Sequence, residues 1–280
     1  MLADPDRLGA PPAESDCPAP GGGGGPDRVV CSDLEDRTVR LALGGESVEN
    51  GPDGADLRFR LRNTLPRVLS WNPFRWLVWA RRDDRWFRAY PRLINQPLGR
   101  IPPGDTVSWR LRVDPAADVG DDVSRQDGVV LGGLGGGEYA VSTTVSTSDT
   151  KVRLATRFEL STPPVELVAP DETGLGRYGP TRATELVEDG DIRVAREPDA
   201  DEPRELVVER TDAEPDRWLV PEQAVRRWPL RDALAWFEPG VDRVVLRADT
   251  ESVPPFRMDG PFVVRYDDSR YRVTPPDMDR

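Results

Sequence analysis

The stretch that decides the fold is residues 69–90, which read LSWNPFRWLVWARRDDRWFRAY. Residues 75–80 and 85–90 are rich in aromatic and β-branched side chains, which suit a pleated strand. The polar break at 81–84 has the length of a hairpin loop. The stretch therefore predicts a β-hairpin whose aromatic side chains anchor the first part of the chain. It holds four of the chain's eight tryptophans, Trp71, Trp76, Trp79 and Trp86.

Side chains on the first arm of this hairpin alternate so that both faces carry apolar groups. Trp76 and Val78 share one face, and Leu77 and Trp79 share the other. A strand with two apolar faces is typical of one covered by a second sheet or a loop. Each buried tryptophan removes roughly 150–250 Å² from water, which at ~25 cal/mol per Å² amounts to several kcal/mol before the entropy cost.

The aromatic and basic side chains of the hairpin allow two interpretations. In the first, the tryptophans pack in the core and the arginines form a solvated face. In the second, part of the hairpin is an exposed surface for an acidic protein partner, because Trp and Arg are favoured at interfaces. Cation–π stacking would then contribute ~0.5–1 kcal/mol per exposed pair. The candidate partner-binding residues are Trp76, Trp79, Arg82, Trp86 and Arg88.

The composition favours a two-domain, acid-rich protein. The chain has 280 residues, a length at which two domains is the natural expectation. It carries 50 Asp and Glu against 38 Lys and Arg, for a net charge of −12, and Lys151 is its single lysine. Concentrated salt screens the self-repulsion of such a chain. In these respects the sequence resembles the proteins of extreme halophilic archaea.

The absence of histidine narrows the possible functions. No histidine occurs in the chain, which removes the commonest general base, the commonest zinc ligand and any Ser-His-Asp or Cys-His site. The negative charge argues against nucleic-acid binding, which needs a basic face. We therefore predict a non-enzymatic protein with no catalytic residues, no cofactor and no metal site.

The two cysteines, Cys17 and Cys31, flank a connector rich in proline and glycine. Two thiolates are too few for a thiolate-only zinc site, which normally takes four. A flexible connector can bring them together, so the sequence predicts a disulfide and an oxidising compartment. The alternative is two unpaired thiols in a disordered tail.

The N-terminal segment bears on localisation. No stretch reaches the ~18 apolar residues of a membrane span, and residues 1–20 lack the apolar core of a signal peptide. A glycine-rich spacer with cysteines before the first strand resembles the mature start of haloarchaeal exported proteins and lipoproteins. This implies an extracellular or cell-surface protein whose upstream signal, and with it any lipid anchor, is missing from the sequence. A cytoplasmic location is the alternative.

Residues 36–162 are predicted to form the first folded domain, after a disordered Pro/Gly-rich segment at 1–35. Frequent turn signals and no helical pattern indicate a β-sandwich. Residues 114–137 read as a long loop, and 44–45 as a turn. The expected strands outside the hairpin are 38–43, 57–62, 107–113, 139–145 and 152–160.

Three motifs carry a family resemblance. They are FRLRN at 59–63, IPPGDTVSW at 101–109 and GEYAV at 137–141. Together they look like an immunoglobulin-like domain and are similar to the secreted β-sandwiches related to the intracellular proteinase inhibitor family. The resemblance implies architecture and supplies no inhibitory loop.

The second domain differs in kind. Pro163 and Pro164 form a stiff linker, and 165–280 is predicted to be a small α+β domain. Two short helices are expected at 221–227 and 230–237, because Pro229 splits the helical stretch. Strands are expected near 191–195 and 205–209, with a closing hairpin over 261–273. The predicted fold class is thus mostly β, with an N-terminal immunoglobulin-like β-sandwich followed by a small α+β domain.

Three other groups of residues carry a weaker chemical signal. The glycines at 132–137 lack the lysine and helix of a phosphate loop. Acidic side chains at 118–127 suit calcium but not the EF-hand spacing, so a calcium site there stays open; they are Asp118, Asp121, Asp122 and Asp127. Glu166, Asp171 and Glu172 read as solvated carboxylates.

Three functions remain open at this point. The first is a binding or structural protein at the surface of a halophilic archaeon. The second is a peptidase inhibitor, which would use a protruding loop such as 114–136. The third is a carboxylate-dependent hydrolase, which needs two carboxyl groups in one pocket, roughly 5–9.5 Å apart.

Overall fold

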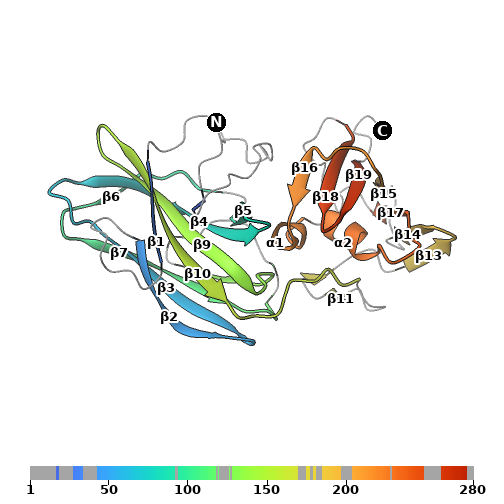
Figure 1. The fold of residues 1–280 in the computed structure, drawn as a ribbon, viewed down its shortest axis with the longest axis horizontal. Coiled ribbons are helices and arrows are strands. Elements are labelled where there is room, and N and C mark those ends of the chain that lie inside the picture. Colours follow the sequence, from blue (N-terminus) through green and yellow to red (C-terminus); the bar gives the residue numbers. More distant parts are fainter. Residues whose placement is uncertain are drawn as a thin grey trace. The chain divides into compact units, whose positions relative to one another are not determined.

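The prediction of a mostly β chain is confirmed, and the strands form two compact units, Met1–Val165 and Glu166–Arg280 (Figure 1). The described part of the chain contains nineteen strands and two short helices. The computed structural model describes residues 17–18, 28–33, 43–91, 94–117, 119, 126, 128–169, 175–176, 179–180, 185–196, 204–227, 229–248 and 260–275.

The first unit contains two sheets. The first sheet has the order β1-β10-β9-β4-β5, with β6 paired to β4 as well. Its neighbours are antiparallel except for β1 and β10, which run parallel. The bounds of its strands are β1 Arg28–Asp33, β4 Leu69–Arg82, β5 Arg85–Tyr90, β6 Gly99–Ile101, β9 Gly137–Ser146 and β10 Lys151–Leu160.

The second sheet of this unit has the order β2-β3-β7-β8. In β3 and β7 alternate residues are buried, as the apolar/polar alternation of both segments predicts. The parallel partner of β7 is β8. The bounds are β2 Leu43–Gly51, β3 Gly54–Arg62, β7 Thr106–Val113 and β8 Gly128–Leu131.

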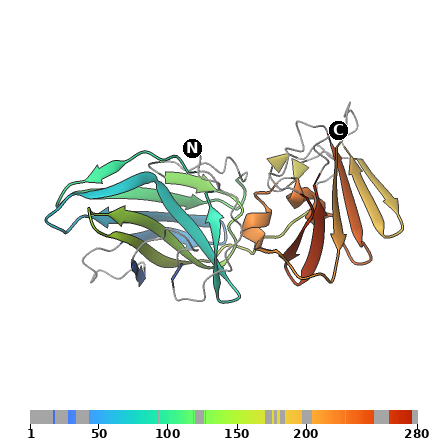
Figure 2. The same ribbon diagram turned by 90° about the horizontal axis from the view of Figure 1, so that it is seen from above.

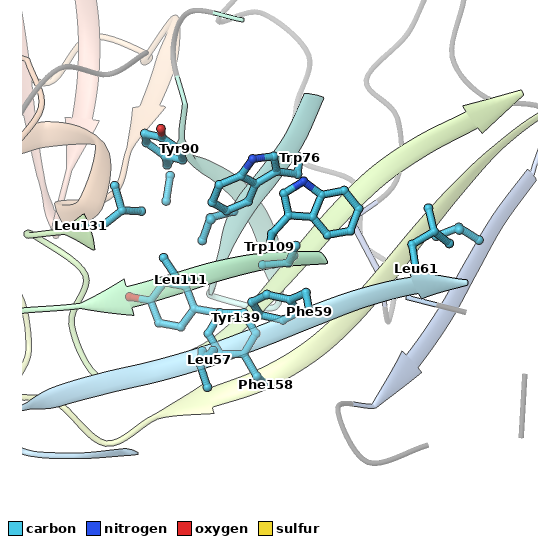
Figure 3. Packing of buried hydrophobic residues seen from close by; sticks show 14 of the residues in the cluster. Leu57, Phe59, Leu61, Trp76, Tyr90, Trp109, Leu111, Leu131, Tyr139 and Phe158 are labelled. Carbon is cyan, nitrogen blue, oxygen red and sulfur yellow. The ribbon is translucent and has the colours of Figure 1, made fainter. Parts of the chain in front are cut away.

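Side chains from both sheets form one core (Figure 3). Trp71 of β4 meets Trp109 of β7 edge to face, with ring centroids 5.3 Å apart. Phe59 of β3 lies 5.7 Å from Phe158 of β10. Because both pairs join one sheet to the other, and aromatic pairs contribute ~0.5–1.5 kcal/mol beyond their burial, these rings fix how the two sheets pack.

Three expectations for this unit are wrong. The segment predicted to be disordered includes β1, in which two β-branched residues, Val29 and Val30, pair with β10. The predicted turn at 44–45 lies inside β2, where Gly44 and Gly45 pair with β3. Residues 38–42 of the predicted strand at 38–43 and the rest of segment 1–35, apart from 17–18, lie outside the described residues, and Leu43 is the first residue of β2.

The third wrong expectation is the long loop at 114–137. It contains β8, so the segment proposed as a protruding inhibitory loop is partly a sheet strand. Gly128 allows the pairing, because its φ is +148° and a Cβ there would meet the backbone carbonyl of Arg110. A side chain at this position would push β8 away from β7.

The second unit is built around a sheet with the order β13-β14-β17-β15-β19-β18-β16. The closing hairpin is confirmed: β18 and β19 pair around Asp267, whose φ is +53°. The expected strands near 191–195 and 205–209 are present as β14 and β15, with β17 between them. The bounds are β13 Glu185–Asp189, β14 Ile192–Arg196, β15 Arg204–Arg210, β16 Arg217–Leu219, β17 Arg243–Ala248, β18 Phe262–Tyr266 and β19 Ser269–Thr274, while β11 Leu175–Gly176 pairs with β12 Gly179–Pro180.

Two short helices lie on one side of this sheet (Figure 2). The helices are α1, Pro221–Ala224, and α2, Leu230–Ala235. Both start where the sequence predicts, with Pro221 in the first turn and Pro229 between them, and both are shorter than predicted. Leu230 and Leu234 of α2 join the sheet core.

Candidate functional site

The hairpin predicted from the tryptophan-rich stretch is confirmed as β4 and β5. Its turn contains Asp83 and Asp84, with φ of +49° and +58°. Two positive φ angles are what a two-residue type I′ turn requires. The turn is shorter than the predicted four residues because Arg81 pairs with Trp86 in the strand register.

Side chains of β4 alternate between the core and the opposite side, which we call the outer face of the first sheet. Trp76, Val78 and Ala80 are fully buried in the core. The interpretation of Trp76 as a partner-binding residue is therefore wrong, and the core-packing interpretation holds for it. Trp79, one residue after Val78, lies on the outer face and keeps part of its surface exposed.

The other candidate residues of the hairpin divide in the same way. Trp86 is only 4% exposed, which leaves little surface for a partner, and the guanidinium of Arg81 lies 5.9 Å from its ring. Arg82 donates hydrogen bonds to the Gly136 carbonyl (3.3 Å) and to the Tyr139 hydroxyl (3.0 Å), so it has a structural role. Arg88 is partly exposed and pairs in register with Trp79.

Trp79 is the centre of a small cluster that crosses three strands. Its indole Nε1 donates a hydrogen bond to the Ser142 hydroxyl of β9 at 2.8 Å. The guanidinium carbon of Arg153, on β10, lies 5.6 Å from the centroid of the Trp79 ring. Arg75 of β4 is exposed and lies close enough for its charge to act on Arg153. We call Arg75, Trp79, Ser142 and Arg153 the Arg153 cluster.

Small residues on β9 and β10 make this cluster possible. Ser142 pairs with Ala155 of β10 and with Leu77 of β4. Ser142 and Ala155 have short side chains, so the long side chains of Arg153 and Trp79 can meet above them. Ser142 is fully buried and Ala155 is 1% exposed.

The charge of Arg153 lies in an unusual environment. Its side chain is nearly buried, with 6% of the residue exposed, and its Nε and Nη1 atoms find no hydrogen-bond acceptor. Burial, followed by the like charge of Arg75, lowers the pKa of Arg153 to about 10. The guanidinium remains charged at neutral pH. Its burial therefore lowers the stability of the folded protein.

Arg81, on the same face, shows the ordinary arrangement. Its Nη1 donates to Glu138 at 2.9 Å and its Nη2 donates to Asp84 at 3.2 Å. Two carboxylates therefore balance its charge. Within the part of the chain that the structure describes, no ion pair of this kind involves Arg153.

The predicted disulfide partners are next to this cluster. The structure joins Cys17 to Cys31, with their Cα atoms 6.2 Å apart, a separation that disulfides commonly span. Cys31 pairs in register with Ala155. Because Val30 packs against the core, Cys31 points to the outer face, two positions along the ladder from Arg153.

Sequence reasoning identified Trp79 and missed Arg153 and Ser142. The alternation of Val152, Leu154 and Phe158 does place Arg153 on the outer face of its strand. A charged residue on such a face is ordinarily solvated, so the pattern alone gives no reason to expect burial. Only the strand order, which places β9 between β4 and β10, brings Arg153 to Trp79.

Most of the other predicted site residues lie outside the described part of the chain. The calcium candidates at 118–127 lie outside the described residues, as do Asp171 and Glu172, while Glu166 is exposed. The glycines at 132–137 lead into β9, a strand, so no helix N-terminus is available for a phosphate. Asp232, a buried carboxylate that the sequence did not single out, pairs with Arg231 at 2.9 Å.

Among the described residues, no group of three His, Cys, Asp or Glu side chains is placed to hold a metal ion. None of the helices in the described ranges is long and apolar enough to cross a membrane. The fold and the cluster define a mostly β protein with a buried arginine on an outer sheet face. Comparison of the chain with protein-family models, curated proteins and solved structures found no match.

Proposed function

We propose that this chain is a non-enzymatic extracellular or cell-surface binding protein of a halophilic archaeon, and that the outer face of its first sheet contacts the partner. The observation that carries the proposal is the Arg153 cluster. Trp and Arg are the residue types that most often dominate interface energy. Here they lie together on one sheet face, and Trp79 is partly exposed.

The strand order supports an immunoglobulin-like β-sandwich as the scaffold of this binding face. In the first sheet β9 lies between β10 and β4, and in the second sheet β3 pairs with β7. The chain passes from β3 in one sheet to β4 in the other and back to β7. Strands F, G and C, with B and E opposite, have the same arrangement in immunoglobulin domains. Many cell-surface domains share this sandwich architecture.

Two further properties support a location outside the cell. A disulfide between Cys17 and Cys31 persists in oxidising compartments and is rare in the cytosol. The net charge of −12 with a single lysine suits a protein surrounded by concentrated salt. Extracellular fluid of a halophile combines both conditions.

Site-specific photo-crosslinking tests the proposal. Lys151 is exposed on the strand that carries Arg153 and lies on the same face, while Val130 is exposed on β8 of the other sheet. Benzoylphenylalanine is placed at each position in turn, and the two proteins are irradiated with halophile cell envelopes at growth salt concentration. We expect a discrete cross-linked species from position 151 and none from position 130.

Two controls make the crosslinking decisive. Trp79→Ala in the position-151 protein should abolish the species while the protein remains folded by circular dichroism. The same set of products from positions 151 and 130, or no product from either, would overturn the binding function.

A further inference from the structure

Arg153 is a buried cation for which the described residues supply no counter-ion. Buried polar groups in native proteins almost always have a hydrogen-bond partner, and each exception calls for an explanation. Arg153 is 6% exposed, and its Nε and Nη1 atoms lack any acceptor. A guanidinium cannot escape the cost of burial by losing its proton near neutral pH. The cost is therefore permanent in the unbound protein.

The contacts that Arg153 does make position the guanidinium without neutralising it. The Trp79 ring, 5.6 Å from the guanidinium carbon, offers a cation–π contact. The hydrogen bond from the Trp79 indole to Ser142 holds that ring in place. A ring face attracts the cation but does not accept its N–H donors in the plane of the guanidinium. The donors at Nε and Nη1 are buried and have no acceptor among the described residues.

A second cation strengthens the preference for an anion. Arg75 is exposed and close enough for its charge to act on Arg153. Arg75 lies where the register of β4 against β9 shifts, between Trp71 and Trp76. Two neighbouring arginines, one of them buried, form a place where an anion relieves both the mutual repulsion and the unmet donors.

We propose that Arg153 and Arg75, with Trp79 beside them, form a binding site for a carboxylate of an acidic protein segment. This inference rests on the proposed binding function and names the chemistry of the partner. Arginine binds carboxylates with charge-assisted hydrogen bonds, which are about twice as strong as neutral ones. An acidic side chain of the partner would pair with Arg153 in the way that Glu138 and Asp84 pair with Arg81.

Burial also makes this site suitable for concentrated salt. At 1 M salt the Debye length is about 3 Å, so attraction between exposed charges is largely lost, while buried pairs are screened much less. Arg153 is nearly buried. A carboxylate that pairs with its guanidinium therefore forms a contact that salt weakens little.

The test measures binding of a fluorescent hexaglutamate peptide by anisotropy, with hexaglutamine as the neutral peptide. Arg153→Gln and Arg75→Gln each remove one member of the site, and Arg81→Gln is the matched control on the same face. Because a hydrogen bond to a charged group contributes ~1.5–3 kcal/mol, we expect Arg153→Gln to weaken binding roughly ten- to hundredfold. Arg81→Gln should weaken it by less than about threefold, since Arg81 already has carboxylate partners.

Several results would overturn the carboxylate site. They are equal binding of hexaglutamine, equal losses in the Arg153→Gln and Arg81→Gln proteins, or competition by millimolar inorganic phosphate as strong as that by the peptide. The last result would identify a general anion site. If Arg153→Gln fails to fold by circular dichroism, the exposed Arg75→Gln decides the test.

The outcome separates this inference from the proposed function. If hexaglutamate does not bind while Trp79→Ala still abolishes the crosslink from position 151, the carboxylate site is wrong and the binding face stands. If the crosslink is absent and hexaglutamate binds through Arg153, the site exists and the cell-envelope partner does not.

Discussion

Replacing Arg153 with methionine should make the protein more stable. Methionine keeps most of the side-chain volume and the packing against Trp79, and it removes a charge that has no partner. Core substitutions usually destabilise a protein by roughly 0.5–3 kcal/mol. A stabilising result at a nearly buried position would therefore be direct evidence that the charge of Arg153 is uncompensated in the folded chain.

The size of the effect follows from the environment of the guanidinium. The fall in the pKa of Arg153 from its ordinary value to about 10 corresponds to about 3 kcal/mol of penalty on the charged form. Loss of the contact with the Trp79 ring offsets roughly 1 kcal/mol of the gain. We expect a net increase of about 1–2 kcal/mol in the free energy of unfolding. For a unit of this size that raises Tm by roughly 2–8 °C.

The assay is thermal and urea unfolding of Arg153→Met beside Arg81→Met, at one fixed salt concentration. Arg81→Met breaks two ion pairs and should leave Tm unchanged or lower it. The reasoning fails if Arg153→Met lowers Tm as much as a usual core substitution does. That result would mean that the folded chain already neutralises Arg153.

Three further predictions concern the scaffold. Trp76→Ala should lower the free energy of unfolding by about 3–5 kcal/mol, because the ring is fully buried beside Tyr90. Urea unfolding measures this change. Cys31→Ser should lower the free energy of unfolding by about 3 kcal/mol, because it opens a disulfide loop that spans a sequence separation of 14 residues. A reductant should lower the Tm of the wild type and leave that of the variant unchanged. The hydrogen bond from Arg110 lowers the pKa of Asp56 below 3.8, and the hydrogen bond from Arg193 lowers the pKa of Glu238 below 4.5. Both ion pairs therefore contribute fully to the free energy of unfolding above these ordinary pKa values, and the contribution is lost as the pH falls below them. The free energy of unfolding of Asp56→Asn should therefore change less between neutral and acid pH than that of the wild type.

Local patterns in the sequence predict much of the fold. The hairpin at β4 and β5, the alternating strands β3 and β7, and the closing hairpin β18 and β19 each combine a two-residue period with nearby turn residues. Such signals lie within a few residues of the structure that they determine. Two of the three errors in the first unit occur where the pairing partner is far along the chain: β1 pairs with β10, and β8 pairs in parallel with β7 across a long connection. The third, the turn expected at 44–45, lies in β2, which pairs with the next strand, β3.

The candidate site was less predictable for the same reason. The aromatic stretch drew attention to five hairpin residues, of which Trp76 belongs to the core and Arg82 to a structural network. Which tryptophan faces outward depends on the sheet that covers the other face. That a residue on β10 meets Trp79 depends on strand order, which no local spacing encodes.

The lack of a carboxylate beside Arg153 does not arise from a shortage of acids. The chain carries 50 acidic residues. Arg193, for example, contacts two carboxylates, those of Glu188 and Glu238. The register neighbour of Arg153 on β9 is Thr144, and the next position on its own face is Ala155. Among the described residues, the fold therefore places neutral side chains and a second cation, Arg75, near this guanidinium and leaves its Nε and Nη1 donors without an acceptor. The uncompensated charge of Arg153 lowers the stability of the free protein, and a carboxylate of a partner would neutralise it. Such a loss of stability in favour of binding is common at functional sites.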